Sequence, residues 1–128
     1  MFDEFDILDF VQVYVKQADT GLPIYIQKPP NNVRENHIWI NHLQFIELDY
    51  FHKLPININV FYKYHEDSGM VDDEIRTVVR KIRDSIDTIS TTNGQYRRAK
   101  REFTEPIPDL KEGFYCINIR LLLTTDKN

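Results

Sequence analysis

The residue types that most often bind metals are few and scattered along this chain. They are four histidines and a single cysteine: His37, His42, His52, His65 and Cys116. Zinc proteases place two histidines four residues apart on a helix, and structural zinc sites use pairs of cysteines. Neither spacing occurs here, so we expect the histidines to be surface or turn residues that bind no metal.

Candidate nucleophiles also lack the context that activates them. Cys116 lies in a segment whose apolar residues alternate, which predicts an interior strand and a buried, unreactive thiol. Ser68, Ser85 and Ser90 lack the glycine-flanked turn that exposes a catalytic serine. The sequence therefore indicates no nucleophilic catalysis.

Carboxylates cluster at the two ends of one predicted helix. Asp72, Asp73 and Glu74 stand at its start, and Asp84 and Asp87 lie on its polar side. Acids at a helix start cap the helix and complement its dipole, so both clusters are typical of structural roles. The chain's four glycines stand far apart, which excludes the glycine-rich loops that bind nucleotide phosphates. We expect no enzyme activity and no cofactor.

A basic run is the most distinctive polar feature of the chain. It contains Arg97, Arg98, Lys100 and Arg101. Three interpretations stay open: a solvated, strongly charged edge strand or loop that resists edge pairing, a contact with an acidic neighbouring subunit, or a contact with nucleic acid. The net charge of −4 argues against tight binding to nucleic acid, because proteins that neutralise phosphates are normally basic.

Two other segments are candidates for an interface. Tyr50 and Phe51 lie shortly before a proline, beside a predicted turn, where aromatic residues either anchor a partner or pack locally. The next segment alternates apolar residues with Asn57, Asn59 and Lys63. That alternation predicts a strand with one packed face and one mixed face suited to a channel or a contact surface.

Hydrophobic periodicity predicts two helices and four to five strands. Residues 71–89 repeat apolar side chains at helical spacing, and residues 3–18 do so less regularly. The expected strands are 22–27, one long bent strand or two short ones within 37–49, and then 55–64, 95–103 and 113–124. Residues 105–109 are expected to form a rigid loop. The order α-β-β-β-α-β-β predicts an α+β fold, with a mainly antiparallel sheet of four to five strands and two helices packed on one face.

The overall composition is that of one globular domain. A chain of 128 residues, of which 41% are hydrophobic, can bury a sizeable core. A single cysteine excludes an internal disulfide bond. The acidic first residues differ from a secretory signal, and no apolar run is long enough to span a bilayer. We expect a single domain, 1–128, in a reducing compartment.

The order of elements resembles that of the tail-terminator, or tail-completion, proteins of tailed bacteriophages. The likeness lies in a leading helix, a short strand with Pro23 and a bent middle hairpin. It continues with the strand 56–61 leading through an acidic turn into the helix 73–89, and with the strong final strand 115–123. The resemblance implies a structural protein of the virion.

The resemblance also implies partners and a location. Members of this family form rings at the head-proximal end of the tail, usually hexamers, with a dodecamer as the alternative. The ring caps the tail tube and joins it to the head connector, and DNA passes through it without sequence-specific binding. Such a protein acts in the virion and is assembled in the host cytoplasm. On this view Asn57, Asn59 and Lys63 line a ring surface, and the run 97–101 reaches an acidic neighbour. Two hypotheses compete with this one: a monomeric adaptor that binds one protein partner, and a small hydrolase or nuclease that uses dispersed acids. We expect no membrane partner.

Overall fold

The chain folds into six strands and two helices. The computed structural model describes residues 3–48, 51–89 and 96–126, and of 96–98 and 126 it describes the backbone alone. In chain order the elements are α1 (Glu4–Gln17), β1 (Ile24–Ile26), β2 (His37–His42), β3 (Ile46–Glu47), β4 (Phe51–Lys63), α2 (Glu74–Ile86), β5 (Tyr96–Pro106) and β6 (Phe114–Asp126).

The strands form one mixed sheet in the order β1-β2-β4-β6-β5, and β3 pairs with the beginning of β4. Only β1 and β2 run parallel, and β4 pairs antiparallel with β6 over its full length, from Phe51 opposite Asp126 to Lys63 opposite Phe114. The predicted α+β fold is confirmed. The sheet gains one strand over the expected number because the segment 37–49 forms two short strands, of which β3 has two residues.

Helix α1 begins at a reciprocal cap. The carboxylate of Asp3 accepts a hydrogen bond from the Asp6 amide, and the carboxylate of Asp6 accepts one from the Asp3 amide. This capping box satisfies two backbone donors that a helix start leaves unpaired. The helix ends at Ala18, and Gly21 then turns the chain with a φ of 76°. Glycine adopts this backbone conformation without strain.

Helix α2 is shorter than the periodic pattern predicts. Val71 and Ile89 lie beyond its ends, yet both pack against the core. After Ile86 the backbone tightens, since the Ile89 amide bonds to the Ile86 carbonyl three residues back. Hydrophobic periodicity indicates which side chains face the core. Val71 and Ile89 face the core too, although they lie outside the hydrogen-bonded helix, so the pattern is longer than α2.

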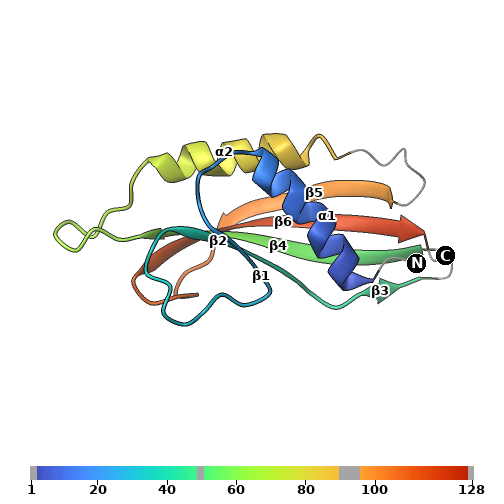
Figure 1. Cartoon of the computed structure of the whole chain (residues 1–128), viewed down its shortest axis with the longest axis horizontal. Helices are drawn as coiled ribbons and strands as arrows, with labels where there is room; N and C mark the ends of the chain where they lie inside the picture. The colour runs from blue at the N-terminus through green and yellow to red at the C-terminus, as the bar shows by residue number, and fades with distance from the viewer. Residues whose placement is uncertain (1–2, 49–50, 90–95, 127–128) are drawn as a thin grey trace.

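Both helices lie on the same side of the sheet (Figure 1). The hydrophobic core lies between the helices and the sheet. The sheet contributes alternate residues of its central strands to this core, and each helix contributes one stripe of residues. The buried core residues include Ile7, Leu8, Val11, Val15, Ile38, Ile40, Leu54, Ile56, Ile58, Val60, Tyr62, Ile75, Val78, Val79, Ile82, Ile86, Ile119, Leu121 and Leu123. The Ser85 hydroxyl also donates to the Tyr14 carbonyl and so ties the two helices together.

Two strand boundaries differ from the prediction. β4 begins at Phe51, so the aromatic segment expected beside a turn lies partly in a strand, and Pro55 lies within that strand. Proline has no backbone N–H to donate to a neighbouring strand. Pro55 is tolerated because β2 ends at His42, opposite Ile56, so the side of Pro55 without a donor faces the end of β2. β5 continues to Pro106, where a loop was predicted, since an edge strand accommodates a proline on its unpaired side. None of the described helices has the length and apolar content to cross a membrane.

Candidate functional site

The second face of the sheet carries the most unusual side chains of the molecule, and we call it the free face. Strand alternation turns the odd-numbered residues of β2 and β4 and the even-numbered residues of β6 away from the helices. Within the described parts of the chain, no helix packs on this face. The free face is therefore the natural place to search for a functional surface.

An amide network runs across the middle of the free face. Asn57 Nδ2 donates to Asn41 Oδ1 at 2.9 Å, and Arg120 Nε donates to Asn57 Oδ1 at 2.8 Å. Asn118 Nδ2 reaches Asn57 Oδ1 at 3.2 Å and Asn59 Oδ1 at 2.9 Å, and Asn59 donates to a backbone carbonyl. Asn59 and Asn118 are each only 3% exposed, so their hydrogen bonds are shielded from water. Asn118 Oδ1 is buried without a hydrogen-bond partner in the described part of the chain.

One end of the free face is aromatic. The ring of His37 stacks on Phe61 with centroids 4.7 Å apart, and it meets the edge of Phe114 at 5.4 Å. Trp39 also stacks on Phe61, at 6.3 Å. Burial lowers the pKa of His37, although a hydrogen bond between Nδ1 and the Glu35 carbonyl acts in the opposite direction. His37 is thus a neutral ring in the packing of this end.

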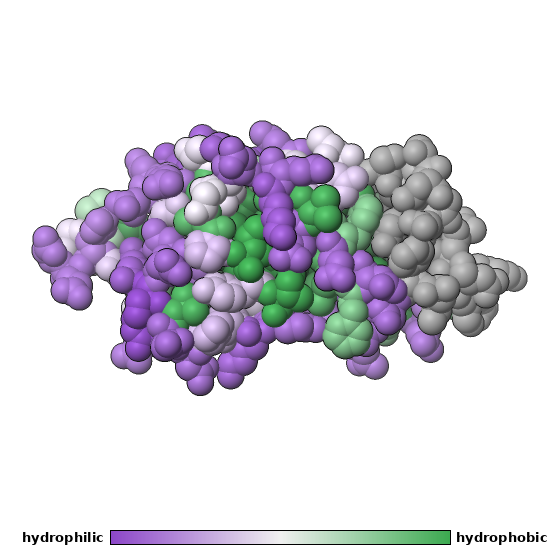
Figure 2. Space-filling model, viewed as in Figure 1, coloured by the Kyte–Doolittle hydropathy of each residue, from purple (hydrophilic) through white to green (hydrophobic). Residues whose placement is uncertain are grey.

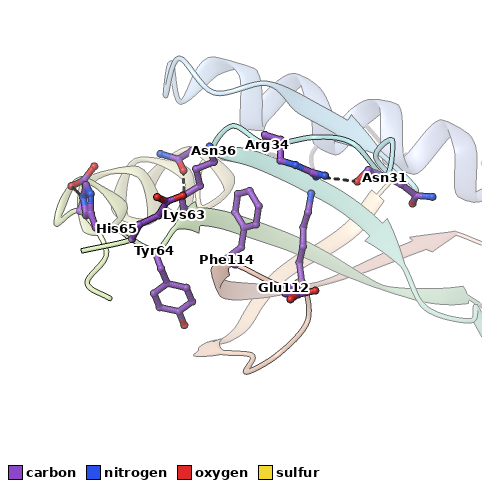
Figure 3. Close-up of a pocket in the computed structure, with 12 residues that line it drawn as sticks. Asn31, Arg34, Asn36, Lys63, Tyr64, His65, Glu112 and Phe114 are labelled. Atoms are coloured by element: carbon purple, nitrogen blue, oxygen red, sulfur yellow. Dashed lines mark hydrogen bonds and ion pairs between the residues drawn. The ribbon is translucent and has the colours of Figure 1, made fainter. Parts of the chain in front are cut away.

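Two pockets adjoin the aromatic end. The smaller, of about 300 Å³, is mainly apolar and is walled by Pro29, Pro30, Trp39, Phe61 and Leu110. The larger, of about 1040 Å³, is an open hollow whose walls come from the β1–β2 loop, the end of β4 and the β5–β6 loop. Figure 3 shows Phe114 between Lys63 on one side and Arg34 on the other side of this hollow.

Charges of both signs line the larger hollow. Its cations include Arg34, Lys63 and Lys111, while Glu112 and Asp72 supply negative charge. Lys111 Nζ donates to the Val33 carbonyl and lies 4.7 Å from the Phe114 ring centroid, and burial lowers its pKa. The charges lie around the rim and do not converge on one point, which suits a wet contact surface better than a reaction centre.

The other end of the free face is basic and partly apolar. Lys100 of β5 is exposed beside half-buried Leu122, and in the next row Arg120 lies over the ring of Phe103 at 5.2 Å. Phe103 is 40% exposed, which is unusual for an aromatic ring. We call these four residues the basic patch.

Apart from Lys100 and Arg101, the predicted interface residues fall into three groups. Tyr50 lies outside the described residues, and so do the side chains of Arg97 and Arg98. Lys63 is exposed at the rim of the larger hollow, and Phe51 is half-buried on the free face with Lys53 Nζ 5.9 Å from its ring. Asn57 and Asn59 belong to the amide network described above. Their roles in an interface stay predictions.

The basic run divides between the two faces of the sheet. Arg101 turns toward the helices and makes two hydrogen bonds to the Asp87 carboxylate, at 3.0 and 3.1 Å, which raises the pKa of its guanidinium. Lys100 turns to the free face and contacts no carboxylate in the described part of the chain. β5 is the edge strand that one interpretation of the run predicted.

The histidine prediction was wrong for two of the four residues. His37 and His52 are buried, because aromatic neighbours provide each ring with stacking or edge contacts: Phe61 for His37 and Phe45 for His52. His65 is exposed and contacts the Asp72 carboxylate at 2.6 Å, a hydrogen bond that raises the pKa of His65.

The remaining candidates for a reactive or metal-binding role lie in environments typical of structural residues. Cys116 is buried as predicted, and burial raises the pKa of its thiol to about 12. Asp73 is the residue before α2, but its side chain makes no capping bond. Burial, together with the neighbouring Glu74, raises the pKa of Tyr62 to about 12. No group of three or more histidine, cysteine, aspartate or glutamate side chains could hold a metal within the described residues.

Reasoning from the sequence missed Asn41, Asn118 and Arg120 as partners of the predicted amides. The signal was present, because Asn118 and Arg120 alternate with the apolar residues of the final strand just as Asn57 does in β4. Recognising the contact required the pairing of β4 with β6, which places Asn57 opposite Arg120 and Asn59 opposite Asn118.

Comparisons with known proteins give distant likenesses in structure. No protein-family model and no curated protein matches the sequence. Among solved structures, the chain is similar to the type 4 fimbrial biogenesis protein PilO from Pseudomonas aeruginosa, with 14% identity and a TM-score of 0.49. The match covers 98% of this chain and 73% of that one.

Proposed function

We propose that this chain is a structural subunit that acts by assembly, and not an enzyme. It forms a ring at the head–tail junction of a tailed bacteriophage, where it caps the tail tube and joins it to the head connector. The observation that carries the proposal is a six-stranded sheet with one face on which no described helix packs and which bears exposed basic and aromatic groups. The order of the elements supports the same proposal through its resemblance to tail terminators.

The polar groups of the sheet support assembly over catalysis. In an enzyme, acids, bases and nucleophiles converge on one pocket with perturbed pKa values. Here the amides of the free face bond to one another, and the thiol of Cys116 is buried with a raised pKa. Groups arranged in this way hold a surface in shape.

A subunit of this kind also needs two different contact surfaces. Closed rings with head-to-tail contacts use one patch on the front of a subunit and another on the back. The helix layer and the free face are two such unlike surfaces on opposite sides of this molecule. Obligate interfaces usually bury roughly 2,000 Å² or more and are rich in apolar groups. Phe5 on the helix layer and Phe103 on the free face are exposed apolar groups of this kind.

The proposal is tested by deleting the gene from the phage genome that encodes it. The expected result, seen by electron microscopy of the lysate, is filled heads without tails and free tail tubes of irregular length. Supplying the chain from a plasmid restores complete particles. Normal virions from the deletion strain would contradict the proposal. Intact particles that fail only at a later step, such as binding to a host receptor, would instead favour the adaptor hypothesis.

A further inference from the structure

The side of α1 that faces away from the sheet exposes apolar side chains next to an acidic one. Residues Phe5, Asp9 and Val13 recur every four positions and so form one stripe, which we call the outer stripe. Phe5 is 61% exposed and Val13 is 51% exposed. Figure 2 shows hydrophobic atoms exposed among hydrophilic ones on the face that α1 occupies. The outer stripe thus presents the Asp9 carboxylate between two exposed apolar side chains.

The outer stripe and the basic patch have opposite charge. Among the described side chains, α1 and its cap carry four acids, Asp3, Glu4, Asp6 and Asp9, against one base, Lys16. The free face carries the cations Lys53, Lys63, Lys100 and Arg120. The acid Glu105 lies one row beyond the basic patch, and the exposed acid Glu102 lies in the irregularity between Arg101 and Phe103. Within the described residues, neither Asp9 nor Lys100 forms an ion pair in its own chain. Both charges are therefore available to a partner.

The two surfaces also match in apolar content and in size. The outer stripe offers Phe5 and Val13, and the basic patch offers Phe103 and Leu122. At the usual rise per residue, a helix as long as α1 extends about 21 Å, which exceeds the roughly 14 Å spanned by four neighbouring strands. One α1 helix is therefore long enough to cover the free face from β5 to β2.

We infer that α1 of one copy docks on the basic patch of the next copy, with Asp9 facing Lys100 and Arg120. This inference rests on the proposed ring and names its contact. The two surfaces lie on opposite sides of the sheet, so the contact is head-to-tail and closes into a ring when the rotation between copies divides a full turn. Because the ion pairs lie near solvent, salt weakens the contact.

A charge exchange between two variants tests the contact. Asp9→Lys reverses the outer stripe, and Lys100→Glu reverses the basic patch, while both positions are exposed in the isolated subunit. Each variant alone brings like charges together, and we expect its association in sedimentation velocity to weaken about tenfold or more. Mixing the two variants in equal amounts restores association, because the reversed stripe of one then meets the reversed patch of the other. Thermal unfolding of each variant checks that the fold is retained.

Two control variants show whether the effect is specific to this contact. Lys81→Glu, an exposed change of the same charge on α2, leaves association unchanged. Phe5→Ser removes an apolar side chain from the outer stripe and changes no charge. We expect it to weaken association, because the apolar part of the contact is lost. If the wild type forms rings that neither exchange variant alters, this contact is wrong while the proposed function stands.

Two further outcomes contradict the inference. A wild type that stays monomeric at all concentrations and never binds tail tubes overturns both the contact and the proposed function. The second outcome is that the wild type binds a short double-stranded DNA, that Lys100→Glu abolishes this binding, and that Asp9→Lys does not change the association of the subunits. The basic patch would then be a contact for nucleic acid.

Discussion

At the scale of single residues, the amide network is the feature that gives the free face its shape. Asn118 donates to two other asparagines in a position that is almost fully buried, so no water replaces those bonds. An unpaired buried acceptor costs more than the bond contributes when it is made. The network therefore fixes the relative positions of β4 and β6 on the side away from the helices.

Replacing Asn118 tests the contribution of the network to stability. We expect Asn118→Leu, which keeps the branched shape of the side chain but leaves the Asn59 amide oxygen without its donor, to lower the free energy of unfolding by about 1–3 kcal/mol. Asn41→Leu, at the half-buried end of the same network, should cost less, about 0.5–1 kcal/mol. Urea denaturation measures both changes. Equal small effects would show that the network contributes no stability.

The two histidines with shifted pKa values predict opposite pH dependences. Burial lowers the folded-state pKa of His37 below 6.5, so the unfolded chain binds the proton more readily and stability falls as the pH drops below about 6.5. The phenyl ring of His37→Phe keeps the stacking on Phe61 but cannot be protonated. The wild type should therefore lose stability relative to this variant between pH 7 and pH 5, as measured by denaturation at each pH.

His65 provides the control with the opposite sign. Its hydrogen bond to Asp72 raises its folded-state pKa above 6.5, so its contribution is complete below about pH 6.5 and is lost as the pH rises through the folded-state value. His65→Gln should thus remove a contribution that is present at pH 5 and that is lost as the pH rises through the folded-state pKa of His65. A wild type and a His37→Phe variant with parallel pH profiles would contradict the role given to His37.

The ion pair of Arg101 and Asp87 fastens the edge strand to the end of α2. A double-mutant cycle with Arg101→Ala and Asp87→Ala should give a coupling energy of about 0.5–1 kcal/mol, because the pair is bidentate but near the surface. The coupling should shrink at about 1 M salt. A coupling near zero at low salt would show that β5 is held by its ladder with β6 alone.

At the scale of elements, patterns in the sequence predicted the helices and most strands well. The stripe of α2 and the alternation in β4 and β6 are local signals that survive folding, because each element buries one face. Boundaries were less accurate. β4 and β5 extend beyond the predicted strands through prolines. Sequence alone does not show that Pro55 faces the end of β2 or that Pro106 lies on the unpaired side of β5.

The core stripe of α2 should be far more sensitive than its solvent face. Ile82 is fully buried, and we expect Ile82→Ala to lower the free energy of unfolding by about 2–5 kcal/mol through lost burial and a residual cavity. Arg80 lies on the exposed side of the helix. Arg80→Ala should change the free energy of unfolding by no more than about 0.5 kcal/mol. Thermal or chemical denaturation distinguishes the two, and similar effects would mean that α2 contributes little to the core.

At the scale of the whole molecule, the candidate surface was only partly predictable. The amides of β4 were identified from alternation, but the basic patch depends on the pairing of β5 with β6, which brings Phe103 opposite Arg120 after an irregularity in register. The aromatic end depends on residues 37, 61 and 114 meeting across three strands. Such contacts between distant segments follow from topology, which local patterns do not specify.

The two sides of the molecule differ in charge, and this difference bears on how copies of the chain assemble. An acidic helix on one side and basic groups on the other favour a repeating contact that always joins unlike surfaces. A symmetric contact between two free faces would instead bring like charges together. We therefore expect rings and no isolated two-fold dimers.

The most direct test of the central claim is the mass of the purified chain in solution at low salt. Size-exclusion chromatography with light scattering should give a species about six times the 15.3 kDa of one chain, with ring-shaped particles in electron micrographs of the same fraction. A mass of 15.3 kDa at every concentration, both alone and in the presence of tail tubes, would contradict the claim that this protein works by assembling.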